Sequence, residues 1–154
     1  MLSVKIRVSS GCFHREHSPH AYEMIDDYLA TCPLDKMQFM EHESGPEILL
    51  WLAAISGGIT LTANLINLVT AIIRARSEGI KKGDHPSHPV ELVIRQDRKD
   101  GEIREEMVLR FGHHEVVESE HIEKALTKTF RKFAESQAKP TAPSTATRRK
   151  KRRR

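Results

Sequence analysis

The chain has 154 residues, with 25 Lys and Arg, 21 Asp and Glu, and a formal net charge of +4. This length suits one domain with its own core, and two cysteines are too few for the disulfide framework of a small secreted protein, so we expect a cytoplasmic fold. The charge is uneven: residues 137–154 carry eight basic and no acidic side chains, which leaves 17 basic against 21 acidic residues, a net −4, in residues 1–136. We therefore expect one domain over 1–136 and a separate basic tail.

The first predicted element is a strand. Val4, Ile6 and Val8 alternate with Lys5 and Arg7, which is typical of a half-buried strand. The same alternation differs from the unbroken apolar region of a secretory signal peptide.

An amphipathic helix is predicted next. Ser18 followed by Pro19 is a helix start signal, apolar residues then recur at helical spacing, and Pro33 ends the segment. Alternation in KMQFMEH predicts a second strand over residues 36–42, followed by an acidic linker that ends at Pro46.

The middle of the chain contains 26 uncharged residues, Ile48 to Ile73. At 100° per residue this run separates an apolar side from a small, polar side, and we predict one long helix over residues 47–76. Because asparagine amides are costly in hydrocarbon, we favour a helix packed on a sheet, with the polar side as a candidate interaction surface. That surface consists of Ser56, Gly57, Thr60, Asn64 and Asn67.

A membrane span is the alternative for this segment. The run is long enough to cross a hydrocarbon layer of ~30 Å. The basic residues that follow it would place the C-terminal side of a single span over residues 48–73 in the cytoplasm.

The last elements are a hairpin and a helix. VELVIRQ and EIREEMVLRF are joined by a segment with Asp100-Gly101, a strong hairpin turn signal, and a helix is predicted from Ser119 to about Glu135. The predicted order is β-α-β-α-β-β-α, an α+β domain with a long apolar central helix packed on a small sheet.

Few residues suggest catalysis or metal binding. Cys12, His14, His17 and His20 lie close in sequence and are weak candidate metal ligands, but no second ligand pair stands at zinc-finger spacing. A glycine-rich phosphate loop, a GxSxG motif and an HExxH motif are all absent. We therefore expect a protein that is not an enzyme, has no cofactor and holds no metal.

The tail is predicted to be disordered, because its Pro, Thr, Ser and Ala spacer and basic block cannot bury enough apolar surface. It could attract nucleic acid, an acidic membrane surface or an acidic protein, but it has no aromatic residue on which a base could stack. The basic block is Arg148, Arg149, Lys150, Lys151, Arg152, Arg153 and Arg154.

The arrangement of segments resembles a known family. An opening strand VKIRV, an amphipathic helix up to LATCP, the apolar WLAAISGGITLTANLINLVTAIIRARS, the hairpin and a terminal helix together resemble the effector-associated constant component family of bacterial conflict systems. The resemblance covers roughly residues 1–136. It implies a small α+β adaptor encoded beside a protease or another toxic effector and a signalling ATPase module. No individual residue role is transferred.

Three functional expectations follow. The first is a non-enzymatic adaptor that binds a protein partner, encoded nearby, or another copy of itself. The second is a small protein anchored by the membrane span, and the third is a nucleic-acid-binding protein driven by the basic tail.

Overall fold

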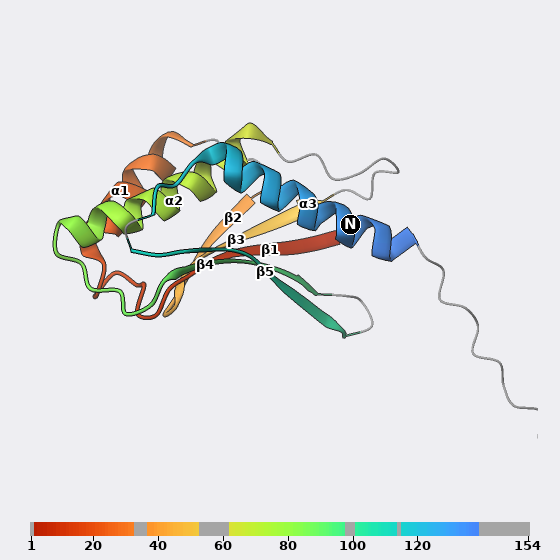
Figure 1. Cartoon of the computed structure of the whole chain (residues 1–154), viewed down its shortest axis with the longest axis horizontal. Coiled ribbons are helices and arrows are strands. Elements are labelled where there is room, and N and C mark those ends of the chain that lie inside the picture. Colours follow the sequence, from red (N-terminus) through yellow and green to blue (C-terminus); the bar gives the residue numbers. More distant parts are fainter. Residues whose placement is uncertain (1, 33–36, 53–61, 98–100, 114, 139–154) are drawn as a thin grey trace, which may run out of the picture.

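The computed structural model describes residues 2–32, 37–52, 62–97, 101–113 and 115–138. Five strands form one antiparallel sheet and three helices cover one of its faces (Figure 1). The chain is therefore an α+β fold, as predicted. The element bounds are β1 Leu2–Ser9, α1 Pro19–Thr31, β2 Met37–His42, β3 Gly45–Leu52, α2 Ala63–Lys81, β4 Val90–Asp97, β5 Ile103–Phe111 and α3 Ser119–Ala138.

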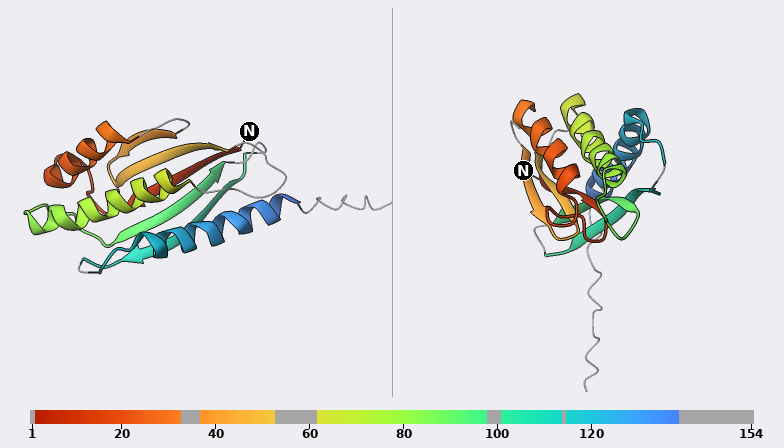
Figure 2. Two further views of the ribbon diagram at one scale, coloured as in Figure 1. Left: turned by 90° about the horizontal axis from the view of Figure 1, so that it is seen from above. Right: turned by 90° about the vertical axis from the view of Figure 1, so that its left-hand side faces the viewer.

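The sheet has the strand order β2-β3-β1-β4-β5, with every neighbouring pair antiparallel. β1 and β2 therefore run parallel on either side of β3, and β3 and β4 run parallel on either side of β1. The segments β1-α1-β2 and β3-α2-β4 are thus two interlocked split β-α-β units. β5 extends the sheet beyond β4, and α3 packs back over it (Figure 2).

The core lies between the sheet and the helices. Val4, Ile6 and Val8 of β1 are fully buried, as the alternation predicted, and Leu68 and Ile72 of α2 are buried above the sheet. α2 lies between α1 and α3 (Figure 2).

The prediction of one helix over residues 47–76 is wrong. Gly45–Leu52 is the strand β3, paired with β2 on one side and β1 on the other, and the helix α2 begins only at Ala63. Thr62 caps that helix, because its hydroxyl accepts a hydrogen bond from the amide of Leu65 at 3.3 Å. Residues 53–61 lie outside the described part of the chain.

This correction also removes the predicted span over residues 48–73. Its first part is a sheet strand, and among the described residues no helix is both long and apolar enough to cross a bilayer.

The acidic linker is shorter than predicted, because Gly45 and Pro46 already belong to β3. Gly45 has φ +135°, and a Cβ there would lie 2.1 Å from the carbonyl oxygen of Val8.

The remaining element predictions are confirmed. α1 begins at Pro19, β2 covers the predicted second strand from Met37, and β4 and β5 form the hairpin. The terminal helix α3 begins at Ser119 and runs to Ala138. The basic block of the predicted tail lies outside the described residues.

Candidate functional site

The predicted polar side of the central helix is present only in part. Asn64 and Asn67 are exposed on the first two turns of α2, whereas Leu65, Leu68 and Val69 of the same turns are buried against the rest of the fold. Ser56, Gly57 and Thr60, the other members of the predicted interaction surface, lie outside the described residues. The predicted polar side is thus exposed at Asn64 and Asn67, but Thr70, which the same pattern places on that side, is buried.

The candidate metal ligands do not converge. Cys12, His14 and His17 line one shallow hollow, but the His20 ring turns away and its Nδ1 lies 2.8 Å from Oδ1 of Asp84. Over the ranges that the structure describes, no group of three or more His, Cys, Asp or Glu side chains is arranged to hold a metal ion.

Asp84 has a structural role that the sequence did not show. Its carboxylate accepts hydrogen bonds from the backbone amides of His20 at 3.2 Å and Ala21 at 2.9 Å, and so caps the N-terminus of α1. Ser18, the predicted cap, makes no side-chain capping bond. Gly79 of α2 allows this approach, since a Cβ there would lie 2.2 Å from Oδ2 of Asp84.

Arg76 is the most unusual buried group of the fold. It is 0% exposed, and its Nη2 donates hydrogen bonds to the hydroxyl of Ser10 at 3.1 Å, to the carbonyl oxygen of His88 and to Nδ1 of His113 at 3.3 Å. The guanidinium thereby joins the end of β1, the loop before β4 and the turn after β5. Its Nε and Nη1 are buried without a hydrogen-bond partner among the described residues.

No described carboxylate compensates this charge. Burial lowers the pKa of Arg76 to about 10, and no described acidic group nearby opposes that shift. The sequence held a signal for the burial: residue 76 follows Ile72 by four and Val69 by seven, which places it on the buried side of α2.

Glu47 is, like Asp84, a buried acidic group, and basic side chains compensate its charge although its Oε1 makes no hydrogen bond within the described part of the chain. Its side chain is 1% exposed in β3, with Arg7 Nη2 at 2.8 Å from Oε2 and with Lys5 Nζ and His42 Nε2 each at 3.5 Å from Oε1. Burial by itself raises the pKa of the Glu47 carboxyl. The hydrogen bond from Arg7 and the charges of Lys5, Arg7 and His42 together lower the pKa by more than burial raises it, so the pKa falls below its usual value.

These residues belong to the face of the sheet that no described helix covers, which we call the open face (Figures 1 and 2). Its charges are mixed: the basic side chains are Lys5, Arg7, Arg95 and Arg110, and the acidic ones are Glu47, Glu91, Asp97 and Glu105. Among the described strand residues of this face, the Lys and Arg side chains are thus matched in number by Asp and Glu, with His42 as a further basic group, and such a balanced face does not favour a polyanion.

Among the side chains that the structure describes, two large apolar ones are exposed on the open face. Ile103 is 56% and Met107 is 55% exposed, and Met107 pairs across the hairpin with Val93. A register shift between Leu92 and Val93 causes this exposure, because Leu92 pairs with Leu109 but Val93 pairs with Met107. The inserted residue reverses the alternation of β5, so Ile103 and Met107 face away from the helices that cover Leu109.

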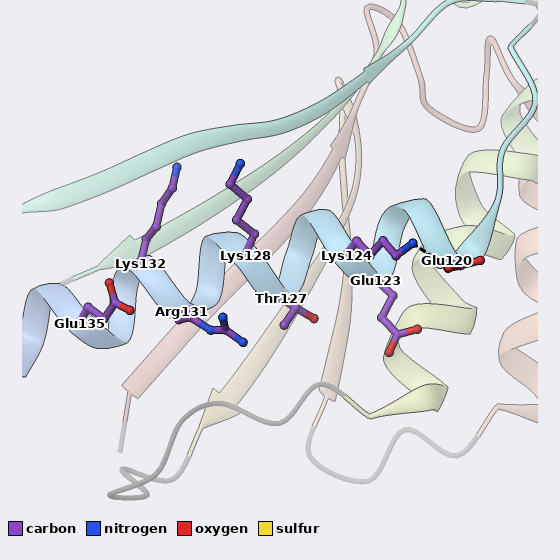
Figure 3. A pocket seen from close by; sticks show the side chains of 8 residues that line it. All are labelled: Glu120, Glu123, Lys124, Thr127, Lys128, Arg131, Lys132 and Glu135. Carbon is purple, nitrogen blue, oxygen red and sulfur yellow. Dashed lines mark ion pairs between the residues drawn. The ribbon is translucent and has the colours of Figure 1, made fainter.

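The outer surface of α3 also forms a depression, but it is lined by one helix. All eight side chains drawn in Figure 3 come from α3. Two of them form an ion pair, in which Nζ of Lys124 lies 2.7 Å from Oε1 of Glu120. Lys132 is paired with Glu106 of β5 at 2.8 Å. Binding cavities are normally enclosed by several elements, so we read this surface as a solvated helix face.

Comparison with known proteins gives no family to which the chain can be assigned. No protein-family model matches it, and no curated protein or solved structure matches it either. The functional argument therefore rests on the geometry described above.

Proposed function

We propose that this chain is an interaction module that binds a protein partner through the open face of its sheet, in the role of a non-enzymatic adaptor. The observation that carries the proposal is the bulge in the hairpin, which exposes Ile103 and Met107 on the open face of β5, on either side of Glu105. An uncovered sheet face that carries exposed apolar side chains at one edge and mixed charges over its inner strands can bury both apolar and polar groups against a protein partner.

The chemistry of the open face favours a protein over other partners. Its apolar side chains offer surface area that a partner can bury. The nearby charged groups, such as Arg95, whose Nε lies 3.0 Å from Oδ1 of Asp97, can fix the orientation of that partner. The resemblance to the constant component of bacterial conflict systems supports a partner encoded nearby, either an effector protease or a signalling ATPase.

The test uses the products of the genes adjacent to this one. Each is co-expressed with the full chain carrying an affinity tag, and the affinity of any complex is measured by calorimetry. We expect the double variant Ile103→Lys, Met107→Lys to weaken the complex at least about tenfold, because it places charges where the partner would bury apolar surface.

Asn64→Lys with Asn67→Lys is the matched control, since it adds the same charge to exposed positions of α2. If this pair weakened binding and the β5 pair did not, the contact surface would be the polar side of α2. An adjacent protease and ATPase that fail to bind the folded chain would overturn the adaptor proposal.

A further inference from the structure

The outer side of β5 is an edge with which no described strand pairs. β5 has nine residues, stands last in the strand order and is hydrogen-bonded to β4 on its inner side. Within the described ranges, no backbone hydrogen bond from a loop or turn reaches it. The free N–H and C=O groups of such an edge can pair with one more strand. The bulge lies just after Met107, so the regular part of this edge is residues 103–107.

Residues 103–107 alternate between the two faces of the sheet. Arg104 stands on the helix side, because its guanidinium carbon lies 4.8 Å from the centre of the Phe133 ring. Glu106 stands on the same side, because its Oε1 lies 2.8 Å from Nζ of Lys132. The residues on the open face are Ile103, Glu105 and Met107.

We propose that a second copy of this chain pairs with the β5 edge, antiparallel to it and with Glu105 on the twofold axis, so that two five-stranded sheets become one continuous sheet. The open faces of the two copies then lie side by side and stay uncovered. The association uses the strand edge, whereas the adaptor proposal uses the open face, so neither depends on the other.

The sequence of the edge is complementary to itself in this register. Ile103 lies opposite Met107 of the second copy on the open face, and Arg104 lies opposite Glu106 of the second copy on the helix side. The symmetry repeats each contact, which gives two apolar pairs and two pairs of opposite charge, and both kinds of cross-strand pair stabilise a sheet. Moving the axis by one residue in either direction destroys the match, because Glu105 then faces Ile103 or Met107.

One contact in this register is unfavourable. Glu105 faces its own copy on the axis, and like charges directly opposite each other destabilise a sheet. Arg95 lies opposite Glu105 on β4, so the row across both sheets reads Arg95, Glu105, Glu105, Arg95. The two arginines offset part of the repulsion, since each of them also contacts Asp97 at 3.0 Å.

Sedimentation equilibrium of the full chain over a concentration series measures the dimer Kd. Arg104→Glu alone, or Glu106→Arg alone, places like charges opposite each other at two points, so each should raise Kd at least about tenfold. The double variant Arg104→Glu, Glu106→Arg restores the opposite charges and should return Kd toward the wild-type value. Damage to the packing of α3 would not be rescued in this way, because the double variant loses the contacts with both Phe133 and Lys132.

A variant at the axis should have the opposite effect. Glu105→Gln removes the like-charge contact, so it should lower Kd about fivefold. Glu91→Gln is the matched control, because it makes the same change on the open face of β4, away from the edge, and should leave Kd unchanged.

Glu105→Cys tests the register directly. The Cα atoms of directly opposed residues in antiparallel strands lie about 4.5 to 5.5 Å apart, a distance that a disulfide can span. Mild oxidation should therefore produce a covalent dimer, seen by non-reducing electrophoresis. Met107→Cys, on the same face but away from the axis, should stay at the wild-type background set by Cys12 and Cys32.

A wild-type chain that remains monomeric up to about 1 mM overturns the proposal. So does a dimer whose Kd is insensitive to both single charge reversals, or a cross-link that forms with Met107→Cys and not with Glu105→Cys. These outcomes leave the adaptor proposal standing, because Arg104 and Glu106 point away from the open face and a monomer can still bind the product of an adjacent gene.

Discussion

Glu47 and Arg76 are both buried, but their surroundings differ in a way that decides what each side chain does. Glu47 has three basic neighbours, so its charge stabilises the pairing of β3 with β1 and β2. Arg76 has described backbone, hydroxyl and imidazole partners on one nitrogen only. Burial alone is therefore a poor guide to the role of a charged residue, and the counter-ion is the informative quantity.

Glu47→Gln should destabilise the fold in a pH-dependent manner. The folded-state pKa of Glu47 is lowered, so its contribution is complete above the usual glutamate pKa of about 4.3 and is lost as pH falls through the lower folded value. We expect a loss of about 3 kcal/mol at pH 7, as is typical when one member of a buried ion pair is removed. Urea unfolding of both proteins from neutral to acid pH measures the difference, which should shrink at low pH; a constant difference would contradict the prediction.

At the scale of elements, the segment from Gly45 shows why an apolar run is ambiguous. β3 is hydrogen-bonded on both sides, and apolar residues such as Leu49 stand on its open face as well as Leu50 on its core face, so no alternation is visible. A run of this kind fits a buried helix and an inner strand equally well. Pairing with β1 and β2 selects the strand.

Leu50→Asp and Leu49→Asp should separate the two interpretations. In a strand, adjacent residues face opposite sides: Leu50 is 4% exposed in the core, while Leu49 lies on the open face opposite Lys5. We expect Leu50→Asp to lower the free energy of unfolding by about 4 kcal/mol, because a buried carboxylate lacks a partner, and Leu49→Asp to lower it by less than about 1 kcal/mol. Chemical denaturation measures both values; similar losses would argue against the strand.

For the molecule as a whole, the three helices lie on one face of the sheet, and no described helix covers the other face (Figure 2). Residues 1–136 carry a net negative charge, while the seven residues from Arg148 to Arg154 are all basic. Attraction of polyanions should therefore depend on the tail, and recognition of a protein partner on the folded domain.

Deletion of Arg148 to Arg154 should abolish a salt-dependent affinity for duplex DNA. If all seven basic residues contact phosphates, the slope of log K against log salt is about −6 for the full chain, and it should approach zero in the truncated chain. Fluorescence anisotropy over a salt series measures both slopes. A truncated chain that kept the steep slope would place the binding surface on the folded domain.

Local chemistry determines most of the elements of this fold. Three of the signals depend on residues close in sequence: the alternation in β1, the helix start signal at Ser18-Pro19 and the Asp-Gly turn of the hairpin. The sidedness of α2 is of the same kind. Such features follow from short-range periodicity and turn preference, so the sequence by itself determined the α+β class and the order of most elements.

Only the tertiary structure decided the features from which function is inferred. Strand pairing made Gly45–Leu52 a strand, and a one-residue bulge opposite Leu92 and Val93 turned Ile103 and Met107 outward. Each of these depends on contacts between residues far apart in the chain. Periodicity contains no information about such contacts, because the sequence alone does not say which strand lies beside which.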